Sequence, residues 1–166
     1  LLHNQESRMQ AIDQEIQGEA EKIVEEIERI LDLNAEWDVK TKRVDERDGH
    51  IVHVEVHTDN TPTFDAVASL LQSREQTHPL PSQPTLRMEC IHSVPRREEH
   101  LWNGQSMNPL DPSMDLKAGM TTTVQLKSVE NGVVSFIGLS HNTIRGAAGG
   151  VVLLAELAYL KKYFEQ

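Results

Sequence analysis

Two residues, Arg43 and His50, have the types and the spacing to act on one substrate. They flank a polar segment, 45–49, whose glycine permits a turn, so both side chains can project into one pocket. An arginine guanidinium offers a fixed fork for a carboxylate, and a histidine can exchange protons near neutral pH. The pair therefore predicts a carboxylate clamp beside a general base, although each residue taken alone is more often solvated surface.

The segment 139–150, with the sequence LSHNTIRGAAGG, lies where a strand is expected to end and a helix to begin. Its small residues leave the backbone bare, and the N–H groups at such a junction can hold an anionic ligand. Glycine and alanine also permit a helix to pack closely on a sheet. The residues alone favour packing somewhat and leave anion binding open.

Three further groups of side chains carry weaker signals. Glu19 and Lys22, three residues apart at an expected helix start, would meet on one helix face as a weak surface ion pair. His53 and His57 of the expected strand 51–57 could join His50 in a metal site. Such repeats of histidine are common on a solvent-exposed strand face, so no metal is expected. Cys90, the single cysteine, has no base beside it in the sequence and is expected to be a buried, inert thiol.

Apolar periodicity predicts the elements that must position these residues. A helical period predicts helices over 7–33 with a break at Gly18, over 64–74, and from 143 or 144 to 163, the last capped by Asn142 and burying Val151, Val152 and Leu154. Alternating patterns predict strands over 35–44, 51–57, 86–92, 120–128 and 132–139, the last two joined by an Asn-Gly turn. A long loop is expected over 93–119. This order indicates an α+β fold, a mainly antiparallel mixed sheet covered by helices.

Length, composition and charge limit the classes of function. A chain of 166 residues is close to the usual size of one domain, so a single domain over 1–166 is expected. The net charge of −10 argues against binding to a nucleic-acid backbone or to an anionic membrane surface. The chain has no apolar run of the length of a membrane span and no signal-peptide pattern at its start, so a cytoplasmic location is expected.

Three motifs follow one another along the chain: GEAEK at 18–22, RV at 43–44 followed by DGH at 48–50, and SHNTIRGAAGG at 140–150 followed by LAEL at 154–157. In type and in order they resemble motifs of aspartate-semialdehyde dehydrogenases of the archaeal and fungal type. The resemblance covers the chain from about Gly18 to its end and is weakest in the loop 93–118.

This resemblance implies the C-terminal catalytic and dimerisation domain of such an enzyme, with a fold similar to the C-terminal domain of glyceraldehyde-3-phosphate dehydrogenase. The implied reaction is the NADP-dependent reduction of aspartyl phosphate to aspartate semialdehyde, through a cysteine thioacyl intermediate and with release of phosphate. It belongs to the biosynthesis of lysine, threonine and methionine and is carried out by a homodimer or homotetramer. The implied roles are acid/base catalysis for His50, substrate binding for Arg43 (carboxylate), Glu19 (amino group) and Lys22 (phosphate), and contact with the nicotinamide end of NADP for Asn142.

The departures from the family pattern qualify this reading. The nucleotide-binding half and the Asn-Cys context of the nucleophile have no counterpart in these 166 residues, so the chain alone is expected to be inactive. Asp45 and Glu46 stand where the family has proline and an apolar residue, and Ile51 replaces a common threonine. Two alternatives stay open: an acyl reductase domain similar to malonyl-CoA reductases, which share the scaffold, and a non-catalytic dimerising module.

Overall fold

The computed structural model describes residues 14–33, 35–46, 48–72, 80–103 and 115–163. The predicted helical residues 7–13 and 73–74 and the loop residues 104–114 lie outside this part of the chain. The chain divides into two compact units, Leu1–Arg47 and Asp48–Gln166, and we describe each by itself. The single domain expected from the length of the chain stays a prediction.

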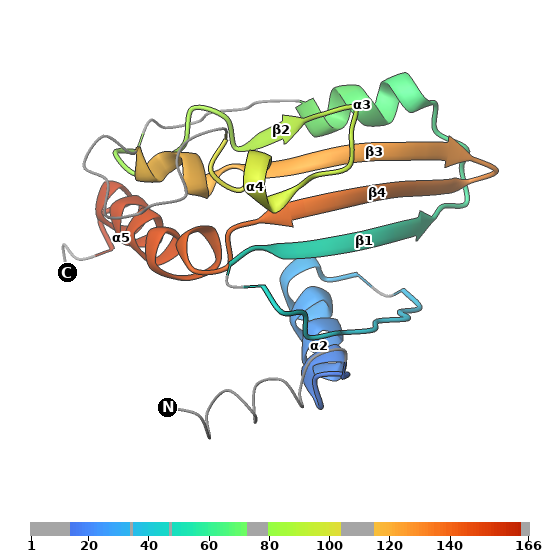
Figure 1. The fold of residues 1–166 in the computed structure, drawn as a ribbon, viewed down its shortest axis with the longest axis horizontal. Helices are drawn as coiled ribbons and strands as arrows, with labels where there is room; N and C mark the ends of the chain where they lie inside the picture. Colours follow the sequence, from blue (N-terminus) through green and yellow to red (C-terminus); the bar gives the residue numbers. More distant parts are fainter. Residues whose placement is uncertain (1–13, 34, 47, 73–79, 104–114, 164–166) are drawn as a thin grey trace. The chain divides into compact units, whose positions relative to one another are not determined.

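The first unit contains helix α2 (Glu19–Leu31), labelled in Figure 1. Gly18 precedes it with φ 77°, a left-handed conformation that glycine adopts readily and that stops a helix. Glutamates in the first turn and Arg29 in the last turn suit the helix dipole. The predicted break at Gly18 and the helix that starts after it are therefore confirmed.

The strand predicted over 35–44 is wrong, because the described residues 35–46 form no strand. These residues have hydrogen-bond partners outside any sheet. The Thr41 hydroxyl donates a hydrogen bond to the Ile16 carbonyl at 3.3 Å, and the Arg43 N–H donates to the Gln14 carbonyl at 3.1 Å. Residues just before α2, rather than a neighbouring strand, thus hold this segment.

The second unit is built on a four-stranded sheet in the order β1-β4-β3-β2 (Figure 1). Its strands are β1 (His50–His57), β2 (Met88–Cys90), β3 (Thr122–Glu130) and β4 (Val133–Ser140). The pairs β1/β4 and β3/β4 are antiparallel, whereas β2 runs parallel to β3. The predicted mixed, mainly antiparallel sheet is confirmed.

The hairpin between β3 and β4 turns at Asn131 and Gly132, whose φ angles of 54° and 77° fit the tight hairpin turn that Asn-Gly predicts. Helix α3 (Phe64–Gln72) lies against β2 and β3 and confirms the predicted helix as far as residue 72. The expected loop 93–119 is wrong where it contains helical turns, namely α4 (Arg97–His100) and a 3-10 turn (Leu116–Met120).

The C-terminal helix begins with a π-helical turn (Ile144–Ala148) and continues as α5 (Gly149–Leu160). The buried face predicted for it is wrong: Val151, Val152 and Leu154 are 66%, 50% and 64% exposed. The carboxylate of Glu156, on this helix, contacts the rest of the unit. It accepts hydrogen bonds from the backbone N–H of Ser82 at 2.9 Å and from the Ser82 hydroxyl at 2.7 Å.

The most deeply buried cluster of the second unit consists of Leu101, Trp102 and Leu139, with Ile51 and Ile144 packed against it. Ile51 lies at the start of β1, and Ile144 lies at the start of the C-terminal helix. This core therefore supports two chain segments that are far apart in the sequence. In the described part of the chain, no helix is long and apolar enough to cross a bilayer.

Candidate functional site

His50 starts β1 at one edge of the sheet, opposite Ser140 at the end of β4. The residues just before His50 are held by the residues just after Ser140. The Gly49 N–H donates a hydrogen bond to Asn142 Oδ1 at 2.9 Å, and the Thr143 hydroxyl donates to Asp48 Oδ1 at 3.2 Å. We call residues 48–50 and 140–143 the His50 corner.

The side chain of Asn142 does not cap the C-terminal helix as predicted. The residue before the π-helical turn is Thr143, which makes no side-chain capping hydrogen bond. The Asn142 carbonyl oxygen instead satisfies the N–H of Gly49, whose φ of 99° is a conformation that favours glycine. Asn142 thus joins the two halves of the His50 corner.

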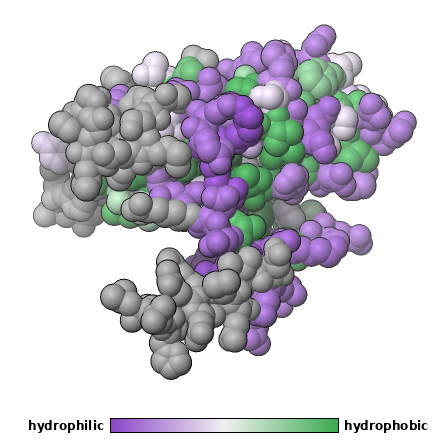
Figure 2. All heavy atoms as spheres, viewed as in Figure 1, coloured by the Kyte–Doolittle hydropathy of each residue, from purple (hydrophilic) through white to green (hydrophobic). Residues whose placement is uncertain are grey.

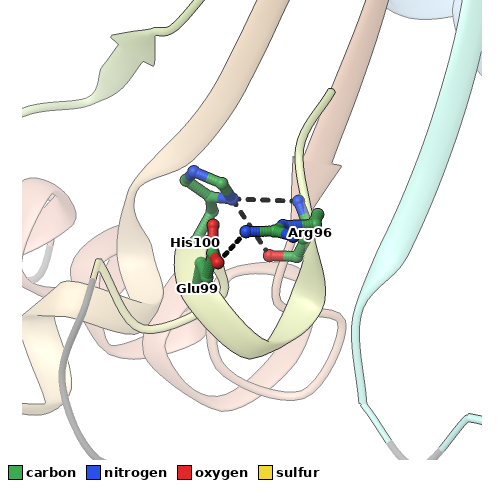
Figure 3. A network of polar contacts seen from close by, with 3 residues as sticks. All are labelled: Arg96, Glu99 and His100. Atoms are coloured by element: carbon green, nitrogen blue, oxygen red, sulfur yellow. Dashed lines mark hydrogen bonds and ion pairs between the residues drawn. The ribbon is translucent and has the colours of Figure 1, made fainter. Parts of the chain in front are cut away.

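A further cation, Arg97 of α4, lies against the corner. Its Nη2 donates a hydrogen bond to the Gly49 carbonyl at 3.4 Å. The short helix is itself fixed by a polar network: the Arg96 guanidinium pairs with Glu99, and the Arg96 N–H donates to His100 Nδ1 at 2.9 Å (Figure 3). The sequence did not indicate this role for Arg97, because nothing in its neighbourhood predicts a contact with residue 49.

His141 is the buried member of the His50 corner and is 2% exposed. Its ring packs against the Trp102 ring in a T-shaped arrangement, with ring centroids 4.4 Å apart and an interplanar angle of 80°. Burial lowers the pKa of His141, an effect that the nearby Asp48 carboxylate opposes. Sequence reasoning treated His141 only as a member of a motif, because no residue pattern there signals burial.

The three remaining predicted site residues belong to the first unit. Glu19 opens α2, and Lys22 lies one turn further, where its ammonium is 3.7 Å from Glu26 in a pair whose members are both exposed. An exposed pair of this kind adds little stability. Arg43 is also exposed. The roles of these residues toward a substrate stay predictions.

Cys90 lies in β2 and is half-buried, not fully buried as expected. In the sheet register Cys90 is aligned with Val124, Gly138 and Val52, at the edge opposite to β1. Three strand spacings therefore separate it from β1, a distance of about 14 Å. A thiol there cannot exchange a proton directly with His50. Among the described residues, no group of three or more His, Cys, Asp or Glu side chains could hold a metal ion.

The small residues of the segment 139–150 are used for packing. A Cβ added to Gly149 would overlap the sulfur of Met120 and would lie 2.9 Å from the Ile144 carbonyl oxygen. A Cβ on Gly150 would lie 2.6 Å from the carbonyl oxygen of Arg145. Both glycines thus permit close approach, and this supports the packing interpretation of the segment over the anion-binding one.

Comparison with known proteins supplies the family context for this geometry. No protein-family model matches the chain. An aspartate-semialdehyde dehydrogenase from Trichophyton rubrum is 30% identical over 168 residues, which cover 89% of this chain and 43% of that enzyme. One from Aspergillus fumigatus is 28% identical over 169 residues, with 89% of this chain and 44% of that enzyme covered. A malonyl CoA reductase (NADP) from Metallosphaera sedula is 49% identical over 49 residues, or 29% of this chain and 14% of that protein.

The chain spans less than half the length of the two dehydrogenases, which is consistent with the expected C-terminal domain. The similarity also extends beyond the three motifs, since it covers 89% of the chain. The resemblance to aspartate-semialdehyde dehydrogenases that the motifs indicated is therefore confirmed: the chain is similar over most of its length to these two dehydrogenases, which are oxidoreductases.

Proposed function

We propose that this chain is the substrate-binding and dimerisation part of an NADP-dependent aspartate-semialdehyde dehydrogenase, which reduces aspartyl phosphate to aspartate semialdehyde in amino-acid biosynthesis. The observation that carries the proposal is the His50 corner, where an exposed histidine starts the edge strand β1 and the two residues before it are held by hydrogen bonds to Asn142 and Thr143. This corner occurs in a chain that is similar to such dehydrogenases over 89% of its length.

His50 is suited to moving protons during acyl transfer. Its side chain is exposed and thus open to a substrate, while the backbone before it is fixed by Asn142, Thr143 and Arg97. In the proposed reaction, His50 removes the proton of a cysteine thiol. The thiolate attacks the acyl carbon of aspartyl phosphate, the C–O bond to phosphate breaks, and phosphate leaves. Proton transfer by a positioned residue of this kind contributes about 10²- to 10⁴-fold to a rate.

Asn142 fits a role beside the nicotinamide. Its Oδ1 accepts the Gly49 N–H, so the orientation of the amide is fixed, and its NH2 group has no hydrogen-bond partner among the described residues. An exposed amide NH2 can donate to the carboxamide oxygen of a nicotinamide. NADPH bound there would supply the hydride that reduces the thioacyl group. His50 would give a proton to the oxygen that becomes negative and take it back as the C–S bond breaks, which releases the semialdehyde and the cysteine thiolate.

The thiol nucleophile is proposed to come from outside these 166 residues. Cys90, the single cysteine, is about three strand spacings, or roughly 14 Å, from the strand of His50. Direct proton transfer needs heavy atoms within about 2.6–3.2 Å or one bridging water. For this reason the chain alone is proposed to be inactive.

Recognition of the substrate is assigned to the first unit. The guanidinium of Arg43 would bind the substrate carboxylate through paired hydrogen bonds, Glu19 the substrate amino group, and Lys22 the phosphate. With a net charge of −10 for the chain, anionic substrates need such local cations. Replacing Arg43 with leucine should raise KM for the semialdehyde more than it lowers kcat.

The second candidate is a malonyl-CoA reductase-like acyl reductase. It is favoured by the identity of 49% over 49 residues to the malonyl CoA reductase (NADP). The cofactor in that protein's name is the same as the one proposed for this chain. Purified complete protein should be assayed for NADP reduction with aspartate semialdehyde and phosphate, and for NADPH oxidation with malonyl-CoA. If the protein turns over malonyl-CoA but not aspartate semialdehyde, malonyl-CoA replaces the aspartyl substrate in the proposal.

Self-association is part of the proposal, as a homodimer or homotetramer. Several apolar side chains of β1 and α5 are exposed: Val52, Val56, Val151, Val152, Leu154 and Tyr159. Figure 2 also shows apolar residues over the strands, with hydrophilic residues around them. A second copy would remove such surface from water. Sedimentation velocity should therefore show a dimer or tetramer, and a monomer at micromolar concentration would contradict this part of the proposal.

The central test is His50→Ala in the complete protein, with His53→Ala as the matched control. His53 is exposed on the same strand, but its side chain points to the opposite face of the sheet. We expect His50→Ala to lower kcat by about 100-fold or more with an unchanged melting temperature, and His53→Ala to retain activity. Equal activity of wild type and His50→Ala would refute the assignment.

A further inference from the structure

We propose that His141 is a positioning residue for His50: its buried imidazole fixes the turn from which Asn142 and Thr143 hold the residues before His50. This inference rests on the proposed function, because it assumes that His50 is the proton-transfer residue. His141 does not contact a substrate in this scheme. It acts through the backbone on either side of it.

The ring of His141 has a fixed seat in the core. It stacks edge-to-face on Trp102, with 4.4 Å between ring centroids. Trp102 is itself buried and immobilised, since a Cβ added to Gly119 would lie only 2.8 Å from its ring atom Cζ3. A side chain wedged against such a surface in a close-packed interior has little room to change rotamer.

Polar contacts tie His141 to the start of the C-terminal helix. Its Nδ1 accepts the backbone N–H of Ile144 at 3.4 Å, and its carbonyl accepts the N–H of Gly146 at 3.1 Å. Nδ1 can accept only if it carries no proton, so the neutral ring has its proton on Nε2. That atom is buried and has no hydrogen-bond partner among the described residues. Burial also lowers the pKa of His141, which favours the neutral ring that this contact requires.

The residues on both sides of His141 transmit its position to the His50 corner. Ser140 is paired with His50 in the sheet register. Asn142 accepts the Gly49 N–H at 2.9 Å, and Thr143 donates to Asp48 at 3.2 Å. A shift of the backbone at 141 would therefore displace the residues before His50 through two hydrogen bonds and the strand pair together.

This arrangement separates two properties of His141, namely the volume of its ring and the acceptor at Nδ1. His141→Phe keeps an aromatic ring against Trp102 but removes the acceptor for Ile144. His141→Asn keeps an acceptor near the position of Nδ1 but loses most of the ring. A purely structural role predicts that activity follows stability in both variants, whereas a positioning role predicts that activity follows the acceptor.

The experiment compares both variants in the complete protein, assayed by NADP reduction with aspartate semialdehyde and phosphate. We expect His141→Phe to lower kcat by about 10- to 100-fold, with KM within about twofold of wild type and a similar melting temperature. His141→Asn should melt at a lower temperature but keep kcat within about threefold when it is assayed well below that temperature. Wild-type kcat in His141→Phe, or a loss of kcat that parallels melting temperature in both variants, would overturn the inference.

A second measurement, hydrogen exchange followed by mass spectrometry on the complete protein, does not depend on turnover. The peptide that contains the Gly49 N–H should exchange at least several-fold faster in His141→Phe, while the peptide covering the middle of β1 should be unchanged. Unchanged exchange at Gly49 would also overturn the inference. The variant His50→Ala, measured in parallel, separates the two hypotheses. If His50→Ala keeps the wild-type kcat, the proposed function fails. If His50→Ala loses kcat but His141→Phe is fully active, only the positioning role is refuted.

Discussion

Replacing Gly49 with alanine should destabilise the protein at the point where the His50 corner is held together. Gly49 has φ 99°, and L-residues with a Cβ rarely adopt this conformation. Backbone strain of this type costs on the order of 1–3 kcal/mol. An added Cβ would also lie 3.1 Å from Cγ and Nε of Arg97, so that side chain would have to move by a few tenths of an ångström. We therefore expect a loss of about 1–3 kcal/mol in the free energy of unfolding, or about 2–4 °C of melting temperature per kcal/mol.

Urea unfolding of four variants, Gly49→Ala, Arg97→Ala, the combination of both and Gly18→Ala, would separate the causes of this loss. Gly18→Ala is the matched control, because Gly18 also has a positive φ, 77°, but a Cβ there would meet no atom within 4 Å. It reports the backbone cost alone. Combining Gly49→Ala with Arg97→Ala removes the close contact, and the resulting double-mutant cycle measures its energy. Wild-type stability of Gly49→Ala would refute the argument, and strictly additive effects would show that Arg97 does not contribute.

Two further predictions concern His141 and the glycines of the helix that follows it. The pKa of His141 is lowered by burial from its ordinary value of 6.5, so the unfolded chain binds more protons between the folded-state pKa and about pH 6.5. The stability that His141 contributes is thus complete above pH 6.5 and is lost as the pH falls toward the folded-state pKa. The urea midpoint of the wild type should therefore fall between pH 8 and pH 5. In His141→Phe the part of this fall that is due to His141 should be missing. Gly149→Ala should cost about 1–3 kcal/mol through overlap with Met120. Gly146→Ala should be nearly neutral, since the nearest atom to its Cβ is 4.0 Å away; equal unfolding free energies of the two alanine variants would contradict the packing role of Gly149.

The parts of the fold that the sequence predicted well depend on local chemistry. The hairpin follows from Asn131 and Gly132, which adopt positive φ easily, and the break before α2 follows from Gly18 for the same reason. Strand β1 follows from the alternation of its valines with polar residues. In each case the pattern within about ten residues decides the backbone conformation, so no knowledge of distant contacts is needed.

The errors concern properties that depend on partners far away in the chain. The alternation in 35–44 predicted a strand, but a strand needs a neighbour, and here the Arg43 N–H and the Thr41 hydroxyl bond to the carbonyls of Gln14 and Ile16 instead. The apolar residues predicted to be buried on α5 are exposed, whereas Glu156 of the same helix contacts Ser82, 74 residues earlier, a partner that no local pattern predicts. Asn142 has the residue type of a helix cap, but its partner is Gly49, 93 residues away.

The π-helical turn explains how one short segment can serve both the corner and the core. Its hydrogen bonds join residues five apart, from the Gly146 N–H to the His141 carbonyl and from the Ala148 N–H to the Thr143 carbonyl. A π-turn holds one residue more than the α-helical turn it replaces, so it changes which side chains face the same direction. In this chain it lets Asn142 and Thr143 reach the residues before His50 while Gly149, a few residues later, lies against Met120. The contacts before the turn hold the candidate site, and the glycine after it permits the close packing of the helix, so the segment 140–149 links the site to the core.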